Sequence, residues 1–220
     1  YTGGTTIAVG TLQIGNGGTR GAITGAIADN GALVFNRSDA VTYAGAISGS
    51  GTLTQAGSGT LTLTGAGTYT GGTAIAAGTL QVGNGVTSGA ITSAIADNGA
   101  RVFNRSDTLT YAGEISGGGT LTQAGSGTLA LNGNNAYSGG TTIAAGTLSL
   151  GTSSAAGTGT VATSDGTTLQ AGADGLTLNN MIALASGKAN SDTQNYSLTL
   201  NGGLSGAGIT KLGAGTLTLT

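Results

Sequence analysis

The feature that most constrains this chain is a tandem repeat of 68 residues. Residues 1–68 and 69–136 align without a gap and are identical at 52 positions. The Tyr-Thr-Gly-Gly-Thr string that begins at Tyr1 returns at Tyr69, and a variant of it begins at Tyr137. Copies in strict register are typical of elongated solenoids, in which each unit covers the face of the unit before it. A globular enzyme with a single active site has no need of tandem copies in strict register.

Composition excludes several other classes of protein. The 220 residues include 46 Gly but no Pro, Cys or His, and only 6% are charged. Disorder is a poor fit because 38% of the residues are hydrophobic, and the missing proline excludes collagen. No apolar run is long enough for a membrane-spanning helix. A net charge of −2 with 6 basic residues argues against a nucleic-acid partner.

The ends and the cysteine usage bear on where the protein resides. The lack of cysteine removes disulfides and thiol chemistry and is compatible with an exported bacterial protein. No signal peptide is visible. The chain begins and stops inside repeats, so we expect a fragment whose targeting signals lie outside it.

Short alternating strands joined by glycine corners are expected throughout. Strings such as Thr60-Leu61-Thr62-Leu63 alternate polar and apolar residues, which is typical of half-buried strands. A Gly-x-Gly-Thr-Leu motif begins at Gly57, Gly125 and Gly213, at intervals of 68 and 88 residues. The difference of 20 residues is about one coil of a parallel β-helix.

We therefore expect an all-β chain folded as one continuous parallel β-helix over residues 1–220. Units 1–68 and 69–136 would hold about three coils each, and unit 137–220 would hold about one coil more than either of them. Roughly ten coils at about 4.8 Å each predict a rod on the order of 50 Å long. A β-propeller is the less favoured alternative, since its blades are shorter and several are needed to close a ring.

Substitutions between the copies suggest which side chains face inward. Leu33 becomes Arg101, so this position is expected to face solvent in the second copy at least. Six pairs of equivalent positions keep an apolar or aromatic residue. We place the four apolar pairs inside the coil and leave the faces of the two aromatic pairs open: inside are Leu12/Leu80, Leu53/Leu121, Leu61/Leu129 and Ile14/Val82, and open are Tyr43/Tyr111 and Phe35/Phe103.

Residues 57–65, 69–73 and 78–83 together resemble the passenger-associated repeat of bacterial autotransporters, and the pattern returns over residues 125–151. This resemblance implies a right-handed parallel β-helix displayed outside a Gram-negative cell. It also implies a C-terminal outer-membrane translocator barrel elsewhere in the parent chain. Residues 152–197 depart from the pattern, which leaves open whether a specialised region lies there.

The acidic residues are the natural candidates for chemistry, because β-helices also host polysaccharide-cleaving enzymes with aspartate clusters. Asp29 and Asp39 recur as Asp97 and Asp107 in identical strings, as turn residues do and a single active site does not. Arg37/Asp39 and Arg105/Asp107 are therefore interpreted as repeated corner contacts. The eight acidic residues are Asp29, Asp39, Asp97, Asp107, Glu114, Asp165, Asp174 and Asp192.

Three of the acids, Asp165, Asp174 and Asp192, occur once, with Lys188 and Lys211 near them in sequence. They are the only candidates for a polysaccharide-cleaving site in residues 152–197, and we expect no catalytic residue. No cofactor and no metal are expected either, since the nonapeptide of calcium β-rolls is absent. Glycine-rich strings such as residues 15–21 lack the helix and Lys-Ser/Thr pair of a phosphate loop. Paired threonines as in ice-binding solenoids occur in only some coils.

The sequence thus predicts a structural role. We expect a β-helical stalk of a surface-displayed autotransporter passenger that supports export, adhesion or self-association. Its expected partners are the translocator barrel of the parent chain and, through outward Thr, Ser, Asn and Gln, a glycan or a second rod. The alternative is the polysaccharide-cleaving enzyme with its site in residues 152–197.

Overall fold

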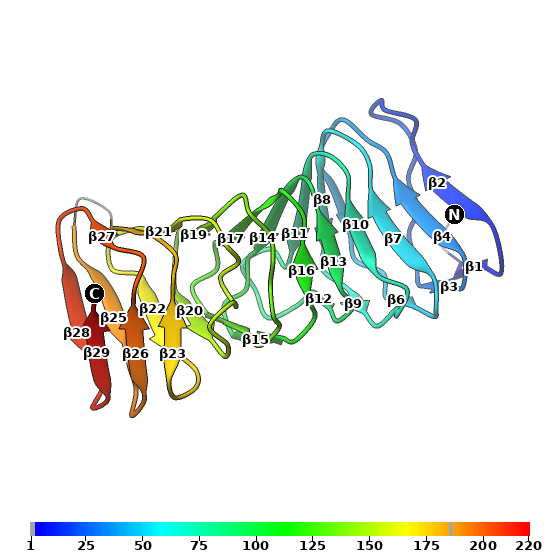
Figure 1. Cartoon of the computed structure of the whole chain (residues 1–220). Helices are drawn as coiled ribbons and strands as arrows, with labels where there is room; N and C mark the ends of the chain where they lie inside the picture. The colour runs from blue at the N-terminus through cyan, green and yellow to red at the C-terminus, as the bar shows by residue number, and fades with distance from the viewer. Residues whose placement is uncertain (1–2, 185–186) are drawn as a thin grey trace.

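A computed structural model describes residues 3–184 and 187–220. Tyr1 and Thr2, with which the first copy begins, lie outside the described residues. Within these ranges there is no helix, and parallel strands stack as a β-solenoid of about 11 turns, seen side-on in Figure 1. The expected fold class, a parallel β-helix, is confirmed.

Successive strands of a coil lie on three faces, which we call A, B and C in chain order. Face A carries two successive sheets: β1 (Thr5–Ile7), β3 (Ile27–Asp29), β6 (Ile47–Ser48), β9 (Ala66–Gly67) and β12 (Ala90–Ile91), then β15 (Thr108–Tyr111), β18 (Thr128–Leu131), β20 (Thr147–Leu150), β22 (Thr168–Ala171), β25 (Ala189–Asp192) and β28 (Ile209–Leu212).

Faces B and C complete each triangular coil. Face B also carries two sheets: β2 (Thr11–Ile14), β4 (Ala32–Phe35), β7 (Thr52–Gln55), β10 (Thr73–Ile75), β13 (Ile95–Asp97) and β16 (Ile115–Ser116), then β23 (Leu176–Leu178), β26 (Ser197–Leu200) and β29 (Thr216–Leu219). Face C is one sheet: β5 (Val41–Tyr43), β8 (Thr60–Leu63), β11 (Thr79–Val82), β14 (Ala100–Phe103), β17 (Thr120–Gln123), β19 (Thr141–Ile143), β21 (Val161–Thr163), β24 (Ile182–Leu184) and β27 (Leu204–Ser205).

The strand register shows that a copy does not hold a whole number of coils. Leu12 pairs with Leu33, Leu33 with Leu53, and Leu53 with Thr73. The residue that repeats Leu12 is Leu80, seven positions beyond Thr73, or about a third of a coil. The second copy is therefore turned onto the next face. Strands β2, β4 and β7 lie on face B, and their equivalents β11, β14 and β17 lie on face C.

The interior is a column of stacked apolar side chains. Strand residues alternate, so that Leu61 and Leu63 of β8 are buried while Thr60 and Thr62 are half-buried on the outer side. Each fully buried leucine contributes about 1.5–3 kcal/mol relative to exposure. Seven of the eight leucine, isoleucine and valine residues predicted to be inside are buried: Leu80, Leu53, Leu121, Leu61, Leu129, Ile14 and Val82; Leu12 of the first coil is half-buried.

The aromatic residues left open by the sequence are also inside. Phe35 packs against Tyr43 with ring centroids 5.8 Å apart, and Phe103 packs against Tyr111 at the same distance. Tyr69 and Tyr137 are fully buried as well. Aromatic rings therefore fill part of the coil interior in both copies.

Glycine is required where coils touch backbone to backbone. A Cβ on Gly59 would lie 2.0 Å from the Asp39 carbonyl oxygen of the preceding coil, and one on Gly127 would lie 2.1 Å from that of Asp107. Gly15 and Gly83 end strands β2 and β11 with φ angles of 84° and 82°, a conformation that L side chains rarely adopt. These contacts explain why the glycines recur at the same places in each copy.

Candidate functional site

The repeated arginine–aspartate pairs are corner contacts, as the sequence predicts. Arg37 Nε and Nη2 donate to the two carboxylate oxygens of Asp39 at 2.8 and 2.7 Å. Arg105 and Asp107 repeat this geometry at the same distances. The Arg37 guanidinium lowers the pKa of the Asp39 carboxyl through this hydrogen-bonded pair. Each guanidinium also donates to a carbonyl of the preceding loop, Arg37 to Gly21.

Asp29 and Asp97 also accept hydrogen bonds from turn amides, but their side chains lie inside the rod. Both are fully buried. The Gly31 amide donates to Asp29 Oδ1 at 3.0 Å, and the Gly99 amide donates to Asp97 Oδ1 at 3.1 Å. Asp29 Oδ2 accepts no hydrogen bond from the described chain, whereas Asp97 Oδ2 accepts one from Arg101. Burial raises the pKa of the Asp29 carboxyl.

The prediction that position 33/101 faces solvent is wrong. Leu33 and Arg101 are both 0% exposed. Arg101 Nη1 lies 3.0 Å from Asp97 Oδ2, and its guanidinium carbon lies 5.2 Å from the Tyr137 ring centroid. An arginine is rarely buried unless it is paired, and here a carboxylate and an aromatic face provide the partners that solvent would otherwise supply.

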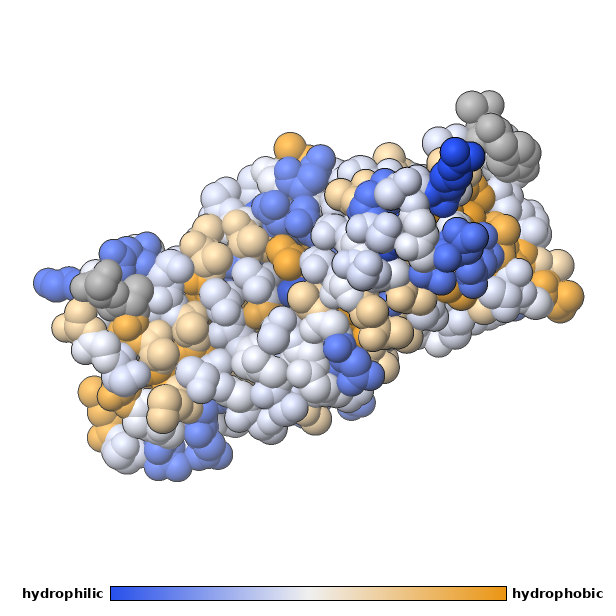
Figure 2. Space-filling model, turned by 90° about the horizontal axis from the view of Figure 1, so that it is seen from above, coloured by the Kyte–Doolittle hydropathy of each residue, from blue (hydrophilic) through white to orange (hydrophobic). Residues whose placement is uncertain are grey.

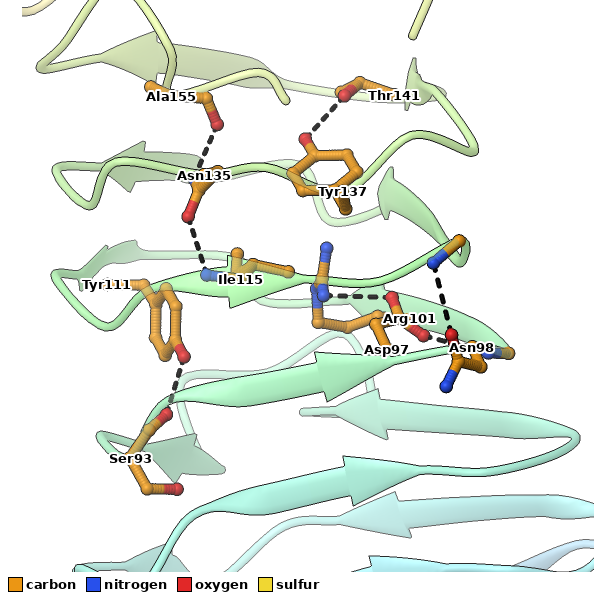
Figure 3. A network of polar contacts seen from close by, with 12 residues as sticks. Ser93, Asp97, Asn98, Arg101, Tyr111, Ile115, Asn135, Tyr137, Thr141 and Ala155 are labelled. Carbon is orange, nitrogen blue, oxygen red and sulfur yellow. Dashed lines mark hydrogen bonds and ion pairs between the residues drawn. The ribbon is translucent and has the colours of Figure 1, made fainter. Parts of the chain in front are cut away.

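Around this pair, polar groups line the interior of the second copy and the start of the third unit (Figure 3). The Tyr111 hydroxyl donates to the Ser93 carbonyl at 2.6 Å. Tyr137 and Thr141 share a hydrogen bond of 2.6 Å, and burial raises the pKa of Tyr137 to about 12. These tyrosines therefore stay neutral and act as hydrogen-bonding and packing groups.

Asn135 extends the same set of contacts to the following coil. The Ile115 amide donates to its Oδ1 at 2.9 Å, and its Nδ2 donates to the Ala155 carbonyl at 2.6 Å. The side chain thereby does what strand pairing does elsewhere on face B. Figure 3 shows Asn135 between the two coils that it bridges.

Three of the positions that differ between the copies build this polar interior. Gly25, Leu33 and Gly67 of the first copy become Ser93, Arg101 and Asn135. Sequence reasoning considered only the arginine, and interpreted it as exposed. The signal that was available is the spacing: with a coil of about 20 residues, Ser93 and Arg101, 8 residues apart, fall within one coil, and Asn135, 34 residues further on, falls less than two coils away.

The acids that occur once do not converge on a shared site. Asp165 follows β21 and accepts from the Gly187 amide at 2.7 Å. Asp174 follows β22 and accepts from the Ser197 amide and hydroxyl, contacts that lower the pKa of its carboxyl. Asp192 ends β25 and accepts from the Gln194 amide at 2.9 Å. In the described ranges, no three Asp, Glu, His or Cys residues are grouped as metal ligands would be.

A groove of about 400 Å³ lies on the outside of face B. It crosses strands β7, β10, β13 and β16 and ends beside the coil segment that holds Asn135. Small residues form its floor, such as Ala74 and Ala96, and Glu114 is the charged residue on its wall. The residues that line the groove include neither a pair of carboxylates nor an aromatic side chain. The groove is therefore a surface of small, mostly uncharged residues.

The rest of the visible surface is also weakly polar. Figure 2 shows mostly pale residues, with separate strongly hydrophilic groups and scattered hydrophobic ones. The exposed large hydrophobic residues lie far apart along the chain, among them Val9, Val86 and Met181. The described residues include no helix able to cross a lipid bilayer.

Comparison with known proteins agrees with this architecture. The passenger-associated-transport-repeat family matches residues 1–14, 53–82, 121–150 and 209–220. The adhesin BmaC autotransporter of Brucella suis biovar 1 (strain 1330) is 58% identical over 103 residues. At these four stretches the chain is similar to autotransporter passengers. Each of the two longer matches runs from a strand of one coil to a strand of the next, β7 to β11 and β17 to β20.

The extent of the similarity limits what it transfers. The matched part is 47% of this chain and 3% of the length of the adhesin. No solved structure matches the chain.

Proposed function

We propose that this chain is a structural stalk segment of an autotransporter passenger displayed on the surface of a Gram-negative bacterium. The observation that carries the proposal is the unbroken ladder of parallel strands on face C, from β5 to β27. Such a ladder transmits load along one axis, and every coil adds about 4.8 Å of reach. The family match and the similarity to an adhesin support the same role.

The stalk is proposed to act without catalysis. Its acidic residues hold turns or pair with arginine, and the charged group at its main groove is Glu114. Its proposed partners are the translocator barrel of the parent chain and, through outward hydroxyl and amide groups, a glycan or a second rod. Export is helped by a chain without disulfides, since coils can stack one on another outside the cell without a chaperone.

Removal of one complete copy tests the stalk. Deletion of residues 69–136 joins two equivalent positions, so we expect the shortened passenger to fold and reach the surface, with adhesion reduced in proportion to its reach. A matched deletion of residues 69–78 removes half a coil, breaks the register, and should abolish display. Surface protease protection and a cell-binding assay measure both. Full adhesion by the shortened rod would contradict a spacer role.

A further inference from the structure

Two neighbouring hollows on face B deepen the proposed function, because together they form a site for a glycan partner. The first is the groove of about 400 Å³ across β7, β10, β13 and β16, and the second is a pocket of about 200 Å³ between residues 153–158 and 179–180. We propose that these two hollows, together called the face-B track, bind a linear, uncharged polysaccharide chain of the surface to which the stalk adheres. This inference rests on the proposed adhesive stalk.

The groove and the pocket adjoin at a hydrogen bond. Asn134 lines the groove, Ser154 lines the pocket, and Ser154 Oγ donates to Asn134 Oδ1 at 3.2 Å. From Thr52 to Asn179 the lining residues come from seven successive coils. The six steps between these coils, at about 4.8 Å each, give the track a length of about 29 Å. A site of this length accommodates an extended chain of several sugars and not a single sugar alone.

The floor of the groove lets a sugar chain approach the backbone. Ala74 pairs with Ala96, and Ala96 pairs with Ser116, so these small outward side chains lie one above another along the rod. Glu114 and Asn134 also line the groove and supply its polar edge. A sugar ring can therefore contact the floor while its hydroxyl groups reach the polar side chains.

The pocket exists because the strand ladder of face B is interrupted there. The sheet ends at β16 and resumes at β23, and loops replace arrows between these strands in Figure 1. Residues 153–156 form a turn, which the Gly157 amide closes by donating to the Ser154 carbonyl at 3.0 Å. From the next coil, Asn180 Nδ2 donates to the Gly157 and Gly159 carbonyls at 3.1 and 2.6 Å. Hydrogen bonds therefore fix both walls of the pocket.

Three side chains of the pocket keep hydrogen-bonding capacity for a ligand. Asn180 is 5% exposed, and its Oδ1 accepts no hydrogen bond from the described residues. Ser153 Oγ accepts from the Thr177 amide at 3.0 Å and keeps its hydroxyl hydrogen. Asn179 Oδ1 accepts from Asn201 Nδ2 at 2.7 Å, and its own Nδ2 can still donate. Uncharged donors and acceptors of this kind match the hydroxyl groups of a sugar.

Charge selects against acidic polysaccharides. Among the described residues that line the two hollows, Glu114 is the only charged one, and it is exposed. A sulfated or uronic acid chain would find no arginine or lysine among these residues and would meet a carboxylate instead. The large hydrophobic side chains along the track, Leu53, Ile95 and Ile115, are at most 1% exposed and so cannot anchor a peptide. An uncharged sugar chain fits this surface best.

Calorimetric titration of the full chain with cellohexaose, an uncharged and extended chain of glucose units, tests the proposal. We expect saturable binding of cellohexaose, and binding at least about tenfold weaker of a hyaluronan hexasaccharide, in which uronate groups alternate along the chain. Absence of saturable cellohexaose binding, or tighter binding of the acidic chain, overturns the proposal. Neither result would alter surface display and reach, which test the stalk itself.

Two matched pairs of variants locate the site. Ala96→Leu fills the groove floor and should abolish binding, whereas Ala28→Leu alters the equivalent exposed residue of the first copy, on face A, and should leave binding unchanged. Asn179→Ala and Asn201→Ala remove the same hydrogen bond, but of the two only Asn179 lines the pocket. Asn179→Ala alone should therefore weaken binding, by about fivefold. If an alanine-to-leucine variant fails to fold, the asparagine pair decides. Equal effects within a pair overturn the proposal.

Discussion

The two 68-residue copies have nearly the same sequence and nearly the same strand bounds, yet they build different interiors. Leu33 is buried inside the first copy, and Arg101, paired with Asp97, is buried at the same position of the second. The outer corners are unchanged, because Arg37–Asp39 and Arg105–Asp107 have the same hydrogen-bond distances. Local contacts therefore fix the corners of this solenoid while its interior varies between an apolar and a charged side chain.

Removal of a buried leucine should have the largest effect and tests whether the two interiors are equally strong. Leu53→Ala and Leu121→Ala each leave a cavity at a fully buried position, with an expected loss of about 2–5 kcal/mol. Urea unfolding followed by circular dichroism measures both. Leu121 stacks on Arg101, whereas Leu53 stacks on Leu33. Because truncation beside the arginine removes fewer apolar contacts, it should cost less than truncation of Leu53. A larger cost at Leu121 contradicts the comparison.

Replacing a glycine at a contact between coils should have the next largest effect on stability. A Cβ on Gly119 would lie 2.2 Å from Asp97 Oδ1, so Gly119→Ala should destabilise the chain by about 1–3 kcal/mol. Gly118 is the control, because its Cβ would meet nothing closer than 4.0 Å and the first copy has Ser50 there. Gly118→Ala should stay within about 0.5 kcal/mol. Melting curves of both variants decide, and similar losses at the two sites would be contrary to expectation.

Asn135 should matter more than its neighbour. Asn135→Ala leaves the Ile115 amide and the Ala155 carbonyl without their partner, at a cost of about 1–3 kcal/mol. Asn134 is exposed and contacts Ser154 at 3.2 Å, and its replacement by alanine should cost less than about 0.5 kcal/mol. Equal effects in thermal unfolding would remove the bridging role of Asn135.

The buried aspartates should respond in opposite directions to exchange of their neighbours. Leu33→Arg should lower the pKa of Asp29, and Arg101→Leu should raise that of Asp97, because a positive neighbour favours the carboxylate. Burial raises the pKa of Asp29 above 3.8. Its protonation therefore stabilises the fold below that pH, and the contribution is lost as pH rises through the folded value. Carboxyl carbon NMR shifts against pH measure both groups, and shifts in the same direction would contradict this account.

The exposed corner pairs should have the smallest effect, and the same effect in both copies. Asp39→Asn and Asp107→Asn remove one partner of pairs whose aspartates are 35% and 37% exposed. The expected fall in melting temperature is slight and vanishes at high salt. Because the pKa of each carboxyl is lowered, the stabilisation is present above pH 3.8 and is lost as pH falls through the folded value. A salt-independent loss would show that the pairs act by other means.

Much of the fold could be predicted from the sequence, for a physical reason. Alternation in strings such as residues 60–63 sets strands, and coil-contact glycines recur because a Cβ there would strike backbone. The 20-residue difference between repeat spacings gave the coil length. The sequence did not predict that each copy runs about a third of a coil past a whole number of coils. This offset depends on which strands pair and not on the local pattern of residues.

The interior polar groups were the part that sequence reasoning could not place. Arg101 was expected outside because arginine usually is, and its burial depends on Asp97, four residues earlier, and on Tyr137 of a later coil. The corner pairs were found because both partners are local and repeat together. Contacts between coils join residues about 20 positions apart, and a single sequence gives no sign of which of them meet.

The third-of-a-coil offset between copies turns the same loop to two sides of the rod. The loop of residues 15–21 follows a strand of face B, and its counterpart, residues 83–89, follows a strand of face C. An antibody or receptor that recognises this loop would therefore find it facing two directions, at points about 16 Å apart along the axis.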